Sequence, residues 1–304
     1  AGAKVVLPNQ HILPDAPKSG IVINLPDQRL YYFPAGGGAP LSYSIGVGRE
    51  GLNTPVGTTS VLRKVHGPTW TPTPRMRKEK PELPASIKPF APDNPMGTHA
   101  MYLGFPQIAI HGTDKPYGIG RRVSSGCIRM YPEGIADIYP RVPVGTKVTV
   151  VDQPVKVGWI GEKMYVEVSP TQDQSFAIEE NGVLTDYEIT TGDMKRITKK
   201  AGEYASLIDW ESVRKAVKEH KGYPVPVLDI KRRPGERVKD DLQALLDDAG
   251  ATHEQVKLPA PEKKAGGVVK KESVSAEKPK ASTKTVSAEP EKKMPPRRNF
   301  NVNN

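Results

Sequence analysis

One side chain in the sequence is a strong nucleophile when deprotonated: the thiol of Cys127, which is the only cysteine among 304 residues. Cys127 lies in the stretch RRVSSGCIRM (121–130), where Ser-Ser-Gly precedes it and Arg129 follows two residues later. Cationic side chains near a thiol lower its pKa and favour the nucleophilic thiolate. A cysteine without such neighbours is more often a small buried apolar residue. The stretch therefore indicates a reactive thiol, with a core residue as the alternative.

A thiolate nucleophile commonly works with a base, and six histidines are available. His111 ends the apolar run QIAIHGT (107–113), which predicts a strand that presents the imidazole at its end. The Gly-rich segment after Gly112 is long enough to return the chain to Cys127, which lies sixteen residues beyond His111. We therefore consider a Cys127–His111 pair, and a histidine that only ends a strand is the alternative.

The elements that must position this pair are short strands within residues 21–152. Apolar residues alternate there with polar ones in runs separated by Gly, Pro, Asn and Asp, a pattern typical of strands and turns. Pro132 suits the first turn of a helix, which we expect to reach about Tyr139. The Pro-rich segment 66–95 lacks periodicity and is long for a loop, so it indicates a functional lid or wall. Strands are expected within 21–34 (as a hairpin), 41–48, 57–65, 99–105, 107–113 and 147–152.

The later part of the chain differs in pattern. A hairpin with a Gly-containing turn is expected at 154–170, and helices are expected over 209–222 and 235–250. The C-terminal residues are rich in Lys, Glu, Pro, Ser and Ala and cannot bury enough apolar surface to fold. The fold class is therefore expected to be mainly β (α+β). The expected parts are an irregular N-terminal linker (1–20), a mainly β domain with the Cys–His pair (21–152), a small α+β accessory region (153–257) and a disordered tail (258–304).

The chain carries a net charge of +10, which is typical of proteins with an anionic partner. Residues 259–304 hold eleven of the 44 Lys and Arg residues but only five of the 34 Asp and Glu residues, so much of the positive charge lies in the tail. No basic run is interleaved with aromatic residues and no zinc-finger spacing occurs, which argues against nucleic-acid binding. The histidines are scattered and no cofactor motif is present, so we expect neither a metal nor a cofactor.

No apolar run in the sequence approaches the roughly 18 residues that a transmembrane segment needs. No signal peptide is visible, and the chain opens AGAKVVLPNQ without an initiator Met, which indicates a processed or trimmed product. A single cysteine fits either a cytosolic protein or an exported one that keeps a reactive thiol.

The order of these motifs resembles the active-site signature of the L,D-transpeptidases with a YkuD-type catalytic domain. In that signature a His is followed by a loop of about fifteen residues and then by Ser/Thr-X-Gly-Cys-X-Arg/Asn, to which HGT and SSGCIRM correspond here. Three further stretches resemble the family in the same order: IVINLPDQRLYYF, SIGVGREGLNTPVGTTSV and DNPMGTHAMYL. The resemblance covers roughly residues 5–165. Many members have a second His two residues before the cysteine, where this chain has Ser125, so the resemblance leaves His111 as the base.

The resemblance implies a YkuD-like β-sandwich with one or two short helices, and a cysteine-dependent transpeptidase reaction. His111 would take the proton of Cys127, or the two would rest as an ion pair, and the carbonyl group of Gly112 would orient the imidazole. Cys127 would attack the carbonyl group after the L-centre of meso-diaminopimelate in a tetrapeptide stem, so that D-Ala leaves and a thioester forms. An amine would then resolve the thioester. Carbapenems would acylate the same thiol.

The resemblance also implies roles for the residues around the cysteine. Backbone N–H groups of residues 125–127 would hold the oxyanion, and Arg129 would bind a substrate carboxylate, with a solvated arginine as the alternative. Ser124, Ser125 and Gly126 would line the substrate pocket, and turn formation is the alternative for the two serines.

Finally, the resemblance implies a periplasmic protein that acts on peptidoglycan stem peptides. The accessory region resembles that of members that attach Braun-type outer-membrane lipoprotein, whose C-terminal lysine would then be the acceptor. The alternatives are 3→3 crosslinking with the amine of diaminopimelate as acceptor, hydrolysis by water, and a non-catalytic peptidoglycan-binding module.

Overall fold

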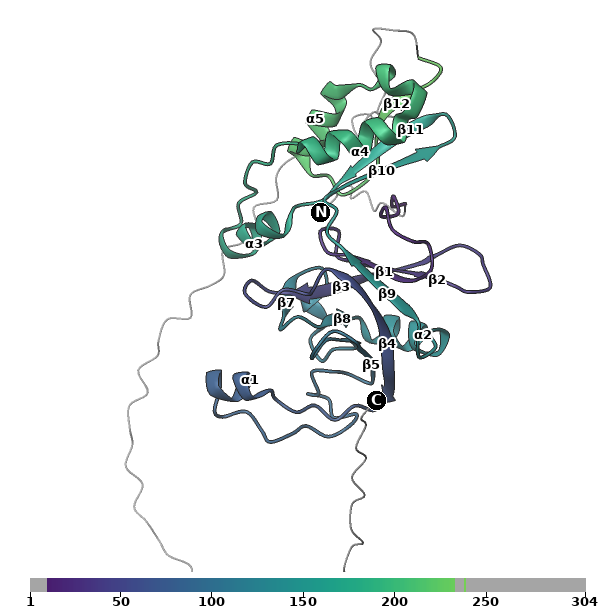
Figure 1. Cartoon of the computed structure of the whole chain (residues 1–304). Coiled ribbons are helices and arrows are strands. Elements are labelled where there is room, and N and C mark those ends of the chain that lie inside the picture. The colour runs from purple at the N-terminus through teal and green to yellow at the C-terminus, as the bar shows by residue number, and fades with distance from the viewer. Residues whose placement is uncertain (1–9, 233–237, 239–304) are drawn as a thin grey trace, which may run out of the picture. The chain divides into compact units, whose positions relative to one another are not determined.

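The computed structural model describes residues 10–232 and residue 238 (Figure 1). These residues all belong to one compact unit that runs from Ala1 to Ala260. The first nine residues of the expected linker, the helix expected over 235–250 apart from Val238, and the tail expected over 258–304 lie outside the described residues. No helix in the described part of the chain is long and apolar enough to cross a membrane.

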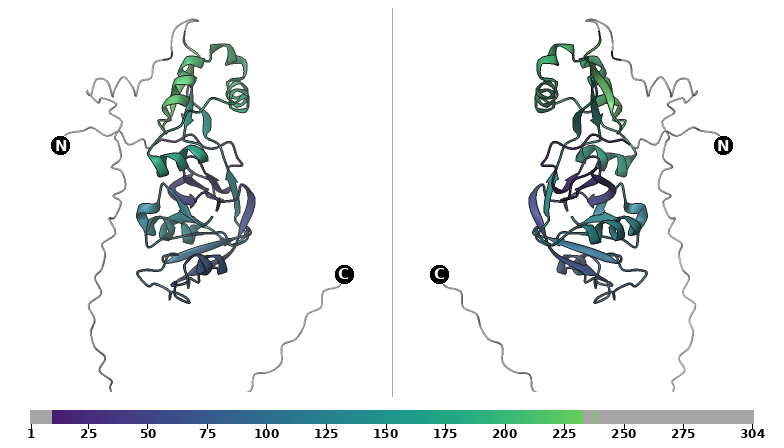
Figure 2. Two further views of the ribbon diagram at one scale, coloured as in Figure 1. Left: turned by 90° about the vertical axis from the view of Figure 1, so that its left-hand side faces the viewer. Right: turned by 90° about the vertical axis from the view of Figure 1, so that its right-hand side faces the viewer.

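Nine strands form the first part of the molecule (Figures 1 and 2). They are β1 (Gly20–Asn24), β2 (Arg29–Phe33), β3 (Leu41–Gly48), β4 (Gly57–His66), β5 (His99–Leu103), β6 (Ala109–His111), β7 (Arg122–Ser124), β8 (Ile128–Met130) and β9 (Lys147–Val151). Eight of them pair in the order β2-β1-β9-β4-β5-β6-β8-β3, and β3 returns to β2, which closes a barrel. The ninth strand, β7, pairs in parallel with the end of β3.

The barrel corrects the expectation of a β-sandwich and confirms that the domain is mainly β. The first half of β3 pairs with β2 and its second half pairs with β8 and β7, so this one strand joins what would otherwise be two sheets. Closure of the ring gives each of its eight strands a neighbouring strand on both sides. The expected hairpin and the strands expected at 41–48, 57–65 and 147–152 match β1 to β4 and β9 within two residues.

The barrel core is apolar and fully enclosed. Ile21 and Ile23 of β1 are each 0% exposed, as their alternation along the strand predicts. The helix expected after Pro132 is α2 (Pro132–Arg141), which ends two residues later than predicted. It packs on the core through Ile135 and Ile138, which are also 0% exposed.

The segment between β4 and β5, expected as an irregular lid or wall, has local structure. It contains the short helix α1 (Pro74–Glu79), and Trp70 forms an antiparallel bridge across the segment. Asn94, which is 1% exposed, holds the segment together because its side-chain amide donates to the carbonyl groups of Pro68 and Lys88. Whether this segment covers a substrate stays a prediction.

The accessory region contains a three-stranded antiparallel sheet with helices packed against it (Figure 1). The expected hairpin is confirmed, and the helix expected to begin at Asp209 does so, with the Asp209 side chain accepting from the Glu211 and Ser212 N–H groups. That helix ends earlier than Gly222 because His220 adopts the left-handed conformation, with φ of 44°. The elements are β10 (Val155–Ile160), β11 (Lys163–Val168), α3 (Gln172–Asn181), α4 (Thr191–Ala201), the 3₁₀-helix η2 (Gly202–Leu207), α5 (Trp210–Glu219) and β12 (Val225–Asp229).

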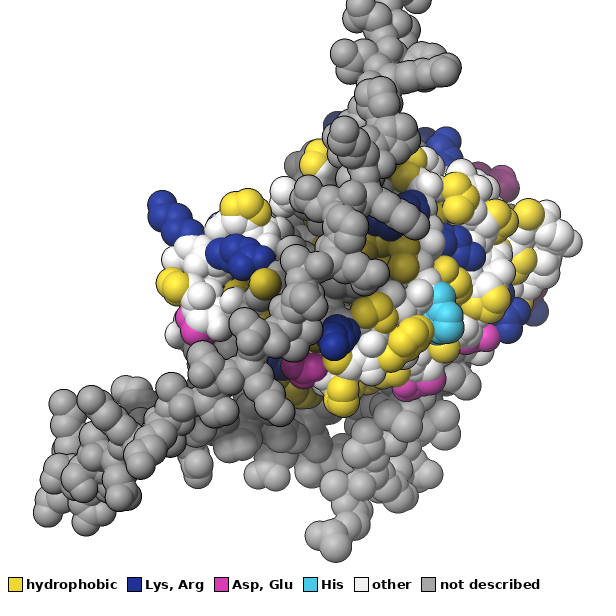
Figure 3. Space-filling model, turned by 90° about the horizontal axis from the view of Figure 1, so that it is seen from below, with side chains coloured by type: hydrophobic (Ala, Val, Ile, Leu, Met, Phe, Trp, Pro, Cys, Tyr) yellow, Lys and Arg dark blue, Asp and Glu magenta, His cyan; other side chains and the backbone are white. Residues whose placement is uncertain are grey.

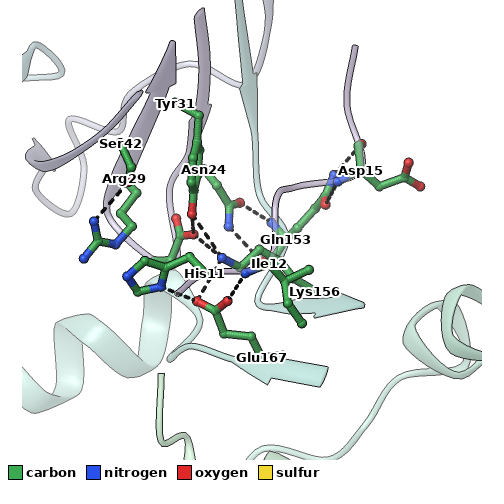
Figure 4. A network of polar contacts seen from close by, with 11 residues as sticks. His11, Ile12, Asp15, Asn24, Arg29, Tyr31, Ser42, Gln153, Lys156 and Glu167 are labelled. Carbon is green, nitrogen blue, oxygen red and sulfur yellow. Dashed lines mark hydrogen bonds and ion pairs between the residues drawn. The ribbon is translucent and has the colours of Figure 1, made fainter. Parts of the chain in front are cut away.

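A buried ionic cluster joins the β1–β2 turn to the β10–β11 hairpin (Figure 4). Lys156 Nζ lies 2.6 Å from Asp27 Oδ2 and 3.0 Å from Glu167 Oε1, and the side chains of Lys156 and Glu167 are 0% exposed. Glu167 also accepts from the Ile12 N–H group at 2.6 Å and lies 3.0 Å from His11 Nδ1. The described half of the expected linker is therefore fastened to the accessory region.

Figure 3 shows the face of the molecule seen from below. Where grey residues leave it uncovered, basic and acidic side chains are interspersed with hydrophobic ones and do not gather into a patch of one sign. Such a mixture is ordinary for the surface of a globular domain.

Candidate active site

Cys127 lies in a tight turn between β7 and β8. Ser124 Oγ donates a hydrogen bond to the Cys127 carbonyl oxygen at 2.6 Å and accepts one from the Gly126 N–H group at 3.1 Å. Ser124 is 1% exposed, so both hydrogen bonds are shielded from water and strengthened by the low local dielectric. The turn is therefore fixed by its own first serine, Ser124.

Gly126 is required in this turn by its conformation and by the space around it. Its φ is +103°, and a Cβ atom there would lie 2.9 Å from Ile108 Cδ1. The Gly126 carbonyl oxygen accepts a hydrogen bond from Thr54 Oγ1 at 2.9 Å. Thr54 Oγ1 in turn accepts a hydrogen bond from the Gly48 N–H group at 3.0 Å. Thr54 thus ties the cysteine turn to the loop that follows β3.

The register of β6 and β8 brings His111 beside Arg129, which follows Cys127 by two residues. These two strands are parallel neighbours, and His111 is the register partner of Arg129. Because register partners in neighbouring strands lie on the same face of a sheet, His111 lies beside Arg129. Ile110 and Ile128, on the opposite face, are 0% exposed in the barrel core. His111 and Arg129 thus share one face of the sheet, and Cys127 directly precedes the start of β8.

His111 is set up as a neutral base. It is 5% exposed, and its Nδ1 lies 2.6 Å from the carbonyl oxygen of Gly112, as the expected orienting contact requires. A carbonyl oxygen only accepts, so Nδ1 carries the proton and Nε2 remains free to take one. Burial, together with the charge of Arg129, lowers the pKa of His111 to about 4 against the opposing effect of the Gly112 hydrogen bond.

Cys127 rests as a thiol in this environment. It is half-buried, and its Sγ donates to the Gln107 carbonyl oxygen at 3.5 Å. Burial raises the pKa of the Cys127 thiol, although a hydrogen bond from the Ala109 backbone and the charge of Arg129 oppose the rise. This corrects the expectation that the neighbouring cations lower the pKa of the thiol and favour the thiolate. A thiol beside a neutral imidazole is therefore favoured over an ion pair.

Arg129 is half-buried and not a solvated surface arginine. It lies between β3 and β6, with Gly46 as its register partner on one side and His111 on the other. Its Nε atom is buried and has no hydrogen-bond partner among the described residues. An unsatisfied buried donor costs about 1–3 kcal/mol or more, and a ligand carboxylate at the guanidinium would offset that cost.

The hydrogen bonds within the turn also indicate which roles the other predicted binding residues can have. The Gly126 N–H group is occupied by Ser124, which leaves the N–H groups of Ser125 and Cys127 as the oxyanion donors to consider. Ser124 is engaged on both sides by the turn, and this favours its alternative role in turn formation. Ser125 is half-buried next to Cys127 and remains a candidate for the substrate pocket.

His99 belongs to the other face of the sheet. The register partner of His111 in β5 is Ala100, so alternation turns the neighbouring His99 side chain away from the face of His111. Its ring stacks on His66, with centroids 4.5 Å apart, and packs against Tyr139 at 4.6 Å. These contacts support a structural role for His99.

Sequence reasoning missed the residues that hold the turn from outside. Thr54 is one, and its signal was the Thr-Pro-X-Gly motif after β3. Arg122 is another: it is 6% exposed, and its Nη2 donates to Asn53 Oδ1 at 2.7 Å. The sequence shows Arg122 only as one of the cations near Cys127, because its side-chain partners lie 50 and 69 residues away.

A polar cavity of about 430 Å³ lies where β7, the loop after β3 and α3 meet. It is separate from the candidate active site, because none of Cys127, His111 and Arg129 lines it. The lining residues are Glu50, Asn53, Arg122, Asp152, Pro154, Thr171, Gln172, Asp173 and Phe176.

Comparison with known proteins finds similarity to L,D-transpeptidases. The family model of the YkuD L,D-transpeptidase catalytic domain matches residues 18–150. The probable L,D-transpeptidase ErfK/SrfK of Escherichia coli K12 is 47% identical over 161 residues, which are 51% of this chain and 51% of that protein. The probable L,D-transpeptidase YbiS of the same strain is 48% identical over 160 residues, which are 51% of this chain and 52% of that protein.

A shorter relative is covered more completely. The putative L,D-transpeptidase in the ATP synthase subunits region of Fuscovulum blasticum is 42% identical over 136 residues, which are 44% of this chain and 70% of that protein. The chain spans about half the length of the two Escherichia coli relatives, and the matched part includes the barrel with Cys127.

Proposed function

The chain belongs to the family of L,D-transpeptidases with a YkuD catalytic domain, and from that premise we propose that it transfers peptidoglycan stem peptides through a thioester on Cys127. The observation that carries the proposal is the register of β6 and β8, which sets His111 beside Arg129, two residues after Cys127. It supports three roles: Cys127 as the nucleophile, His111 as a neutral base, and Arg129 as a cation that binds a ligand anion.

In the first step, Nε2 of His111 takes the thiol proton as Cys127 Sγ bonds to the carbonyl carbon after the L-centre of meso-diaminopimelate. The carbon–nitrogen bond to D-Ala then breaks, and the imidazolium gives its proton to the departing amine. The hydrogen bond from Nδ1 to Gly112 holds the imidazole in the tautomer that this step requires.

Negative charge develops on the carbonyl oxygen during the attack. Two backbone donors next to the nucleophile, the N–H groups of Ser125 and Cys127, support this charge in the proposal. Such a donor contributes about 3–4 kcal/mol to the stabilisation of the transition state. The fixed turn matters here, because preorganised donors need no rearrangement when the charge appears.

Arg129 binds a carboxylate of the stem peptide in this proposal. A planar guanidinium offers paired donors that match a carboxylate, and its buried Nε supports an anionic ligand at this position. The bound carboxylate orients the scissile carbonyl group toward Cys127.

In the second step an acceptor amine attacks the thioester, His111 takes the proton of that amine, and the Cys127 thiol is restored. We favour the C-terminal lysine of an outer-membrane lipoprotein as acceptor, and the diaminopimelate amine of a second stem is the alternative for 3→3 crosslinking. Water as acceptor would make the protein a hydrolase, and failure of the first step would leave a peptidoglycan-binding module. The site of action in this proposal is the periplasm.

The experiment uses the purified chain, a tetrapeptide muropeptide and a synthetic peptide that ends in lysine, with Cys127→Ala as control. Free D-Ala and the products are measured by mass spectrometry. We expect one D-Ala released for each lysine-linked product and none with the control. Crosslinked stems alone, or hydrolysed stems alone, would refute the preference for lysine, and the absence of D-Ala would refute transpeptidation.

A further inference from the structure

Helix α3 of the accessory region contacts the strand that leads into the cysteine turn. Arg122 is the first residue of β7, and its backbone N–H group donates to Glu179 Oε1 at 2.7 Å. Its guanidinium Nη1 donates to Gln172 Oε1 at 2.6 Å. Both acceptors belong to α3, so one arginine fastens the start of β7 to the helix through its backbone and its side chain.

The Arg122 guanidinium also contacts the loop after β3, which holds the cysteine turn from outside. Nη2 of Arg122 donates to Asn53 Oδ1 at 2.7 Å, and the next residue, Thr54, holds the Gly126 carbonyl oxygen. Ser124 holds the turn from within. It lies two residues after Arg122 on β7 and makes hydrogen bonds to both Gly126 and Cys127. Arg122 therefore connects α3 to the two sets of hydrogen bonds that shape the turn.

Arginine suits this position because its planar fork offers donors in fixed directions, whereas lysine offers one point of charge. Burial lowers the pKa of the Arg122 guanidinium, and the carboxylates of Glu179, Asp152 and Asp173 oppose that effect. Removing a partner leaves a buried charge with fewer hydrogen bonds, so the chain around it is expected to rearrange.

Helix α3 is itself well fixed at its first turn. Thr171 and Gln174 form a reciprocal capping box, and Gln174 Nε2 also donates to the Thr185 carbonyl oxygen. A fixed helix start presents the Gln172 side chain in a defined place, which is what a support for β7 needs.

We propose that α3 positions the cysteine turn through Arg122, which makes Gln172 and Glu179 positioning residues for acyl transfer. This gives the accessory region a part in the reaction that neither its sequence nor the family match assigns, and it rests on the proposed function of Cys127. The effect reaches Cys127 through β7 and through the loop that contains Asn53 and Thr54.

The test compares the double variant Gln172→Ala/Glu179→Ala with Glu180→Ala and with Glu179→Gln. Glu180 is the exposed neighbour of Glu179 on the same helix, so Glu180→Ala makes a similar change without touching Arg122. Glu179→Gln keeps an oxygen that can accept the Arg122 N–H group. Two rates are measured well below the melting temperature: acylation of the full chain by a carbapenem, and alkylation by iodoacetamide, which reports on the only cysteine.

We expect the double variant to be acylated at least tenfold more slowly than the wild type, while Glu180→Ala and Glu179→Gln stay within twofold. Alkylation of the double variant should be faster, because a loosened turn exposes the thiol. A purely structural role would lower the melting temperature and leave both rates of the folded protein unchanged, and that result would overturn the proposal.

The two proposals fail separately. If the wild type is not acylated although it is alkylated, the proposed function fails, and the positioning claim is then judged by alkylation alone. In that case, a faster alkylation of the double variant than of Glu180→Ala supports the positioning of the turn by α3, and equal rates overturn it.

Discussion

His111 and Arg129 are register partners in neighbouring parallel strands, and this relationship sets the chemistry of the site. It places the guanidinium of Arg129, two residues after Cys127, beside a buried imidazole, and the added positive charge helps to keep His111 unprotonated. A base that is neutral at pH 7 and oriented by Gly112 is in the protonation state that can accept a proton.

The depressed pKa of His111 predicts how the stability of the fold depends on pH. In the unfolded chain the imidazole has a pKa of about 6.5, whereas in the folded chain it has a pKa of about 4. Between these values the unfolded state binds more protons, so stability falls as the pH falls through this window. From pH 7.5 to pH 5 the loss attributable to His111 is about 2 kcal/mol. Urea denaturation of the wild type and of His111→Gln at both pH values measures this loss in the free energy of unfolding. An equal change in both proteins would contradict its attribution to His111.

Replacing Arg129 tests the carboxylate-binding role. Arg129→Gln removes a charge-assisted interaction that contributes about 1.5–3 kcal/mol, so kcat/KM for the tetrapeptide stem is expected to fall about 10- to 150-fold. The loss of positive charge should also raise the pKa of His111, which NMR titration of the imidazole reports. Arg121→Gln is the matched control, because Arg121 is exposed on the approach to the same turn. Equal kcat/KM values for the two variants would argue against substrate binding by Arg129.

Gly126 tests the geometry of the turn. Gly126→Ala places a Cβ in a left-handed conformation and against Ile108, so we expect a loss of about 1–3 kcal/mol of stability and at least a tenfold slower acylation. Gly145→Ala provides the control, since Gly145 also has a positive φ, of 88°, but a Cβ atom there would meet no other atom within 4 Å. That variant should lose stability and keep its acylation rate. Equal acylation rates in the two variants would mean that the turn geometry does not matter for the reaction.

Lys156 tests the buried ionic cluster. Lys156→Met leaves the carboxylates of Asp27 and Glu167 without their cation, which typically costs about 3–5 kcal/mol. Lys147→Met, at an exposed position of β9, should change stability by less than about 0.5 kcal/mol. The free energy of unfolding from urea titrations compares the two, and similar values would show that the cluster contributes little.

Much of the site was predictable from sequence because its signals are local. An apolar strand that ends in His111, and a Ser-Ser-Gly turn before Cys127, each lie within a few residues. The β1–β2 hairpin and α2 were predictable for the same reason, since alternation and the position of Pro132 are short-range patterns.

The features of the fold and the site that could not be predicted depend on long-range contacts. The closed barrel follows from β3, whose two halves choose different partners, and no local pattern reveals that division. The helix α4 was missed because few of its residues are apolar, and it is held mainly by Ile197 and Ala201 against the second core. The direction of the Cys127 pKa shift was predicted wrongly because sequence shows the neighbouring cations but not the burial that outweighs them.

The central claim is that Cys127 is the nucleophile that accepts the acyl group. The most direct measurement is the intact mass of the full chain after incubation with a carbapenem, for the wild type and for Cys127→Ala, followed by peptide mapping. The account predicts that opening of the β-lactam ring adds one carbapenem to the wild type, on the peptide that contains Cys127, and adds nothing to the variant. A wild type without an adduct, or an equal adduct on Cys127→Ala, would contradict it.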